Sequence, residues 1–149
     1  MKKVVSRKPP TGAPEGTTWF GGPVDRWKVA LRVYGEELDP SRISALLGCE
    51  PSSASLKGAP FPKKGRWILE IDSKDCGEND EVDDGVRMLL ARLPPDLDVW
   101  ASLSNISSVD VFCGIFVVSP NRGFGISAEV SRMLSDRGLE IGFDLYFDP

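Results

Sequence analysis

The residues best suited to do chemistry in this sequence lie in the glycine-containing segment 121–127. Backbone N–H groups at the start of a helix, beside a guanidinium such as that of Arg122, can bind a carboxylate or a phosphate. The string Arg-Gly-Phe-Gly in this segment also matches the start of an RNA-recognition signature, but the match stops where Ile126 replaces an aromatic residue. We therefore interpret the segment as a strand-to-helix turn, with Asn121, Arg122 and Phe124 as candidate contacts to a small anionic ligand.

The sequence contains no histidine, which excludes Ser-His-Asp and Cys-His catalytic groups and His-ligated zinc. Cys113 lies in an apolar segment, where a thiol usually acts as a small core residue, and Asp110 is expected on the opposite face. The seven carboxylates of residues 72–84 lack the residue order of a calcium loop and are expected to be solvated. We predict no catalytic residue, no metal and no cofactor, which favours a non-enzymatic role.

Composition and charge indicate a small cytoplasmic protein. A chain of 149 residues with 41% apolar content fits one domain with one core. The first 30 residues carry six basic and two acidic groups, and the remainder carries 12 basic and 20 acidic groups. An acidic body disfavours nucleic acid, and no apolar run is long enough for a membrane span. Three widely spaced cysteines favour reduced thiols in the cytoplasm over a secreted disulfide framework.

The elements that must position these residues follow from apolar periodicity and from helix start and stop signals. Residues 1–18 are expected to be a flexible N-terminal arm, and residues 19–149 a single α+β domain. Asp39 with Pro40 predicts a helix start, Gly48 a helix end, and Ser127 another start. Alternation predicts strands, and spacing of three and four predicts helices. The expected strands are residues 24–34, 66–72, 108–119 and 139–147, with helices at 40–47, 82–93, 96–106 and 127–137, and a loop at 50–65 in which a short edge strand could form near Leu56.

The predicted fold is a two-layer α+β sandwich of order β-α-β-α-α-β-α-β. Its sheet is expected to have four mainly antiparallel strands with helices on one face, similar in outline to ferredoxin-like folds. In the last strand, Leu139, Ile141, Phe143, Leu145 and Phe147 are expected to point inward. A doubly wound parallel sheet is less compatible with strands that alternate in this way, because its strands are buried on both faces.

One consequence of this fold is an uncovered sheet face. The residues expected there are Arg32, Phe112, Phe116 and Tyr146. Aromatic rings surrounded by charge resemble an interface with an apolar centre and a polar rim. The alternative is that the last strand, the arm or the loop covers these rings.

Several segments resemble the family catalogued as domain of unknown function 4279. The similarity extends over residues 24–147 in the same order of elements. The resemblance implies a small, mainly bacterial protein without an established activity, and it supplies no catalytic residues. The segments that carry it are residues 38–52 (Leu-Asp-Pro to Cys-Glu-Pro-Ser), 57–60 (Lys-Gly-Ala-Pro), 65–67 (Gly-Arg-Trp), 138–140 (Gly-Leu-Glu) and 144–146 (Asp-Leu-Tyr).

Two classes of function remain after these exclusions. The first is a non-catalytic module that binds another protein, or a second copy of the chain, through the open sheet face, or a small ligand at the loop. The second is an enzyme or sensor for a small anionic metabolite, held by Arg66 and Arg122, with a carboxylate as base.

Overall fold

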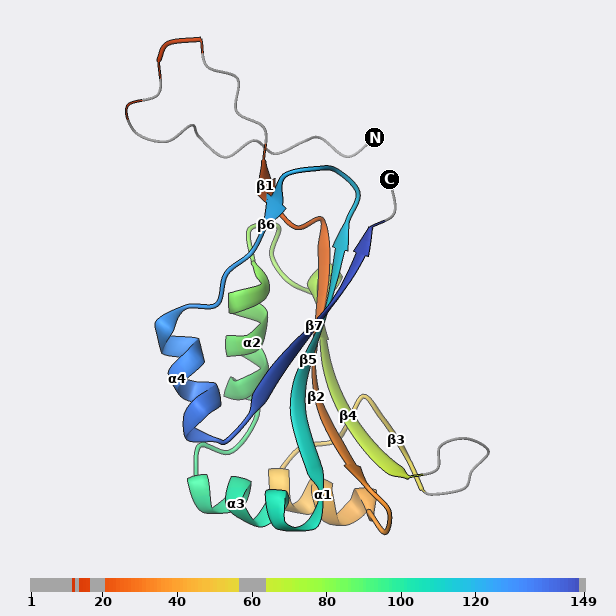
Figure 1. Ribbon diagram of the computed structural model, residues 1–149. Coiled ribbons are helices and arrows are strands. Elements are labelled where there is room, and N and C mark those ends of the chain that lie inside the picture. Colours follow the sequence, from red (N-terminus) through yellow and green to blue (C-terminus); the bar gives the residue numbers. More distant parts are fainter. Residues whose placement is uncertain (1–11, 13, 17–20, 57–63, 148–149) are drawn as a thin grey trace.

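The structure, a computed structural model, describes residues 12, 14–16, 21–56 and 64–147. Within these residues, the chain forms seven strands and four α-helices in an α+β arrangement (Figure 1). The expected flexible arm falls almost wholly outside the described residues. The elements are β1 (Gly22–Pro23), β2 (Arg26–Gly35), α1 (Pro40–Leu47), β3 (Ser53–Ser55), β4 (Gly65–Asp72), a 3-10 turn (Ser73–Asp75), α2 (Val82–Ala91), α3 (Leu97–Ile106), β5 (Ser108–Val117), β6 (Arg122–Gly123), α4 (Ala128–Asp136) and β7 (Glu140–Phe147).

The helix start and stop signals act as predicted. The Asp39 carboxylate accepts a hydrogen bond from the backbone N–H of Ser41 at 3.0 Å, and Pro40 begins α1. Gly48 ends this helix with φ of 68°, a left-handed conformation that side chains rarely adopt. The hydroxyl of Ser127 accepts from the N–H of Val130 at 3.1 Å and begins α4. Local capping chemistry therefore determines where these helices begin and end.

The main sheet has five strands in the order β3-β4-β2-β5-β7, one more than predicted. The additional strand, β3, is only three residues long and pairs with the edge of β4. Three of the four strand pairs are antiparallel, whereas β5 and β7 are parallel. They are parallel because the chain crosses back over the helical side through α4 between them. The ferredoxin-like outline was wrong, because β2 lies antiparallel to both of its neighbours and no split β-α-β unit forms around it.

All four helices lie on one side of the sheet, as predicted (Figure 1). The helical side contains the apolar row of β2, in which Val29, Leu31 and Val33 are fully buried. Trp27, Trp67 and Trp100 are also buried there. The indole N–H of Trp27 donates to the carbonyl of Asp80, that of Trp67 to the hydroxyl of Ser44, and that of Trp100 to the carbonyl of Pro94, at 2.8–3.1 Å. The core thus buries its largest rings without an unsatisfied indole donor.

Helix α2 packs against the middle of the sheet at Gly85. A Cβ atom added at Gly85 would overlap the six-membered ring of Trp27. The guanidinium of Arg87, also on α2, forms two ion pairs. One joins it to Asp83 of the same helix at 3.3 Å, and the other joins it to Glu129 of α4 at 2.6 Å. The close approach at Gly85 therefore sets the depth at which both α2 and α4 lie on the sheet.

The helices do not reach the far half of β7. Leu139 is buried and Ile141 half-buried, but the exposed fractions of Phe143, Leu145 and Phe147 are 38%, 70% and 65%. The prediction that these three residues point into the core was therefore wrong. They face the helical side, but α4 packs only near the beginning of β7 and leaves the end of the strand uncovered (Figure 1). None of the helices in the described residues is long and apolar enough to cross a membrane.

The packing at Gly85 leads to a stability prediction. Gly85→Ala is expected to lower the free energy of unfolding by about 1–3 kcal/mol, because overlap with Trp27 outweighs the higher helix propensity of alanine. Urea unfolding followed by tryptophan fluorescence measures this change. Gly125→Ala is the control, since a Cβ there meets no atom within 4 Å, and it should change stability by less than about 1 kcal/mol. Equal effects of the two substitutions would contradict the proposed packing.

Candidate functional site

The open sheet face brings together several of the predicted residues in two clusters. In the first, the guanidinium of Arg32 binds the Asp110 carboxylate through two hydrogen bonds of 2.8 and 2.6 Å. The same guanidinium lies 4.2 Å from the ring centre of Phe112 and 5.7 Å from that of Tyr34. Its hydrogen bond with Asp110 raises the pKa of Arg32. The Arg32 charge is thus paired with a carboxylate and lies near two aromatic rings, with Asp110 and Phe112 on the adjacent strand β5 and Tyr34 on the same strand, β2.

The second cluster lies at the other end of β5. The rings of Phe116 and Tyr146 stack at 4.9 Å with an angle of 14°, and the guanidinium of Arg26 lies 5.3 Å from the Phe116 ring. The hydroxyl of Tyr146 donates to Asp144 at 3.0 Å, and this hydrogen bond raises the pKa of the phenol. Phe116 is half-buried and Tyr146 is exposed. Of the segments that could cover these rings, the last strand stacks Tyr146 on Phe116 and leaves Tyr146 itself 46% exposed, whereas the arm and the middle of the loop lie largely outside the described residues.

A buried carboxylate on the same face, that of Asp72, lies among three basic side chains. Asp72 is 7% exposed, and one of its oxygens lies 3.0 Å from Arg26, 3.7 Å from Lys28 and 3.9 Å from Lys74. Burial raises the pKa of Asp72, but hydrogen bonds from Arg26 and from the backbone N–H of Lys74, with nearby positive charge, outweigh it and leave the pKa lowered. The basic residues on this part of the face are therefore engaged within the protein.

Arg66 lies far from the loop that contains Arg122. Arg66 pairs across the sheet with Tyr34 near the end of β2, whereas the guanidinium of Arg122 lies beside Asp25, just before the beginning of β2. Nine residues of extended chain separate these positions, which corresponds to about 30 Å. The structure therefore does not bring Arg66 and Arg122 together around one anion.

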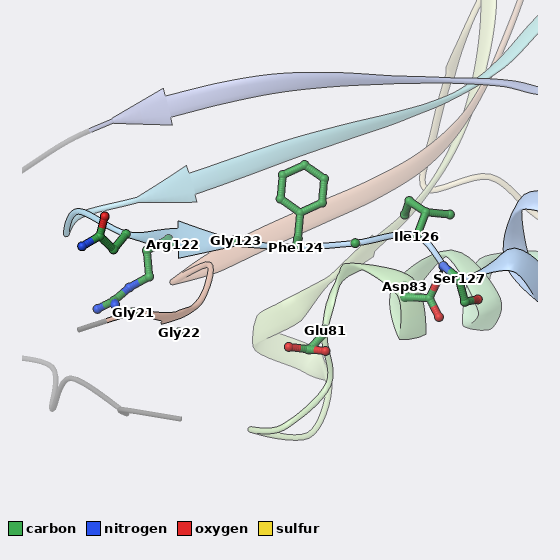
Figure 2. Close-up of a pocket in the computed structure, with 11 residues that line it drawn as sticks. Gly21, Gly22, Glu81, Asp83, Arg122, Gly123, Phe124, Ile126 and Ser127 are labelled. Carbon is green, nitrogen blue, oxygen red and sulfur yellow. Dashed lines mark hydrogen bonds between the residues drawn. The ribbon is translucent and has the colours of Figure 1, made fainter. Parts of the chain in front are cut away.

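The loop itself borders a hollow of about 800 Å³ between β1, β6 and the start of α2 (Figure 2). The carboxylate of Asp83 accepts a hydrogen bond from the backbone N–H of Ser127 at 2.7 Å. Asp83 thus occupies the start of α4 as an internal anion. Glu81 adds a second carboxylate to the hollow, which disfavours an anionic ligand there.

Arg122 and Phe124 both line this hollow, and their side chains extend in different directions (Figure 2). The Arg122 side chain is 6% exposed, and its Nε lies 3.8 Å from the Asp25 carboxylate. Asp25 also accepts from the N–H of Val118 at 2.8 Å, so the pair holds the loop against the start of β2. Asn121 is exposed and has φ of 57°, a conformation that asparagine tolerates in turns.

The ring of Phe124 joins an exposed apolar surface that sequence reasoning did not find. Its centre lies 5.1 Å from that of Phe143 on β7. Next to these rings is a groove of about 360 Å³, with Leu145 and Phe147 on its wall. We call Phe124, Phe143, Leu145 and Phe147 the β7 strip. Alternation along residues 139–147 indicated the correct face for the three strand residues, but alternation carries no signal for whether a helix covers that face.

The groups considered for catalysis and metal binding have other roles. Cys113 is fully buried, and burial raises the pKa of its thiol to about 12, so it carries no thiolate at neutral pH. Within the described residues, no cluster of three Cys, Asp or Glu side chains could hold a metal ion. The acidic loop contributes Asp84 to a capping box with the backbone N–H of Glu81.

The sequence matches the family described as "Domain of unknown function (DUF4279)" over residues 25–148. The chain belongs to this family. The match covers all four helices and the five strands of the main sheet, so the architecture described above is that of this DUF4279 chain. No curated protein and no solved structure matches the sequence.

Asp72 should make the stability of this DUF4279 domain sensitive to acid. Because its folded-state pKa lies below the ordinary value of 3.8, its contribution is present above that value and is lost as pH falls through the folded-state pKa. Asp72→Asn should lower the free energy of unfolding at pH 7 by about 1–3 kcal/mol. The difference from the unmodified protein should shrink below pH 3.8. Urea unfolding at several pH values tests this, with Asp75→Asn, an exposed neighbour, as the control.

The cysteines should differ in reactivity. Iodoacetamide at pH 8 is expected to leave Cys113 unmodified in the folded protein, because its thiol is buried and protonated. Cys49 and Cys76, which are half-buried, should react slowly, since burial raises the pKa of each. Peptide mass spectrometry before and after unfolding measures this order. Labelling of Cys113 first would show that this strand opens or carries an activated thiol.

Proposed function

We propose that this protein is a non-catalytic module that binds another protein at the β7 end of its sheet. The observation that carries this proposal is the β7 strip, in which Leu145 is 70% and Phe147 65% exposed on a strand at the edge of the sheet. Covering either side chain with a partner would contribute about 1–2 kcal/mol. Neighbouring exposed apolar residues on a sheet edge are otherwise an aggregation hazard, so their presence favours a binding role.

The predicted open-face residues fit this interface in part. Tyr146 lies on β7 itself, with Phe116 stacked behind it, so a partner at this edge can contact both faces of the sheet. Phe124 belongs to the strip. Arg32 and Phe112 lie deeper in the sheet, and their contacts with each other and with Asp110 favour a supporting role. The interface is therefore centred on the sheet edge instead of the middle of the open face.

The alternative of an enzyme or sensor for a small anion has less support. Arg66 and Arg122 lie at opposite ends of β2, and Asp83 already occupies the start of α4. The three cysteines are free, which agrees with a location in a bacterial cytoplasm.

The proposal can be tested with a photo-crosslinking amino acid at position 145. In cells that express the full chain, irradiation should produce a defined adduct that excess unlabelled protein suppresses. An excess of the Leu145→Asp, Phe147→Asp double variant should not suppress it. The same amino acid at position 97, where Leu97 is exposed on α3, is the control and should not produce this adduct. The same adducts at both positions, or adducts that competitor protein leaves unchanged, would contradict a binding role for the strip.

A further inference from the structure

Charged residues on the open face differ between the inner strands and the edge strand. On the inner strands, Glu70 lies 3.6 Å from Lys28, Asp72 lies 3.0 Å from Arg26, and Asp110 is bound by Arg32. Within the described residues, no basic group lies within 4.0 Å of the Glu140 or Asp144 carboxylates on β7. Both residues are exposed. The edge strand therefore carries carboxylates of this face that no basic group in the described part of the chain neutralises.

The two faces of β7 consequently present different chemistry to anything placed beside the strand. Glu140, Gly142, Asp144 and Tyr146 point to the open side, and the strand residues of the β7 strip point to the helical side. β5 pairs with one edge of β7, and β7 ends the sheet. A terminal strand offers backbone N–H and C=O groups to a further strand, and side chains of that strand alternate between the same two faces.

We propose that the partner binds as an added strand in which basic and apolar residues alternate. Basic side chains would lie opposite Glu140 and Asp144 on the open side, and apolar side chains opposite Phe143 and Leu145 on the helical side. Glu140 and Asp144 are four residues apart, about 13 Å along the strand, so the recognised segment has two basic residues at the same spacing. In a segment that runs parallel to β7, apolar residues stand between them, opposite Phe143, and immediately after the second basic residue, opposite Leu145. This inference rests on the proposed protein-binding function and specifies the chemistry of its partner.

A second copy of the chain fits this edge less well. In a symmetric antiparallel pairing of two β7 strands, residues that share a face must lie opposite one another. The acidic side of one copy would then meet the acidic side of the other, and their four carboxylates would still have no basic partner. Since the whole chain has a formal charge of −4, two copies also repel each other. A basic and apolar strand neutralises the edge and covers the strip at the same time.

Synthetic peptides test this proposal with the full chain. The probe is an eight-residue peptide with lysine at positions one and five, leucine or valine at positions two, four and six, and threonine elsewhere. Fluorescence anisotropy at 0.15 M salt should show binding of this peptide and at least about tenfold weaker binding of the version with glutamate for lysine. A peptide of the same composition in scrambled order should also bind weakly. Methylation of alternate backbone nitrogens on the pairing edge should abolish binding, because a strand adds through these N–H groups.

Variants of the protein make the test specific. Asp144→Lys should weaken binding of the lysine peptide roughly three- to tenfold and should strengthen binding of the glutamate peptide. In the double variant with Glu140→Lys, the protein should prefer the glutamate peptide over the lysine peptide. Leu145→Asp should weaken both. Glu78→Lys has the same charge change in the exposed acidic loop and should leave both affinities within about twofold. Circular dichroism and thermal unfolding confirm that each variant folds.

Several outcomes would overturn the added-strand proposal. Equal binding of the lysine and glutamate peptides, or no change on charge reversal, would show that the β7 carboxylates do not select the partner. Full binding of the methylated peptide would exclude strand addition. A stable dimer in sedimentation that Leu145→Asp dissociates would assign the edge to a second copy. If the adduct at position 145 remains specific while the peptides fail, the protein-binding function stands and the basic strand is wrong.

Discussion

Helix α2 can lie against the centre of the sheet because Gly85 has no side chain where the ring of Trp27 passes. The position of α2 determines that of α4, through the ion pair of Arg87 with Glu129 and the hydrogen bond from Ser127 to Asp83. Helix α4 in turn reaches only the beginning of β7 (Figure 1). The uncovered end of β7 is therefore a consequence of how deeply one helix packs. The candidate interface depends on a contact in the core, on the same side of the sheet.

Local chemistry made much of this fold predictable from the sequence. Asp39, Pro40 and Gly48 determine one helix, and Ser127 begins another, because capping depends on residues only a few positions apart. The alternation of residues 26–35 and 140–147 likewise predicts which side chains share a face. What could not be predicted is the pairing of elements distant in sequence. The parallel pair of β5 and β7 has no local signal, and the short edge strand expected near Leu56 gave no indication that it would pair with β4.

In the candidate site, too, some features could be predicted from the sequence and others could not. Phe116 and Tyr146 were predicted on the open face, and they stack there because they lie opposite each other in the register of β5 and β7. Phe143, Leu145 and Phe147 were assigned to the core, since apolar residues in an alternating strand are usually covered. The missing cover depends on the length and position of α4. The internal neutralisation of Arg32 and Arg26 is also a result of cross-strand pairing, so conspicuous arginines in the sequence did not indicate free charge in the fold.

The placement of β2 has a further consequence for how the chain reaches its native state. This strand is synthesised before the other strands of the main sheet, yet it occupies the middle of that sheet. Its pairing with β5 joins residues as distant as Arg32 and Asp110, which are 78 positions apart. During translation its edge toward β4 can be matched about halfway along the chain, but its edge toward β5 stays unmatched until residues 108–117 have left the ribosome. Pairing between strands so distant in sequence slows folding. Until it is complete, the apolar row of β2 is exposed and can be bound by chaperones.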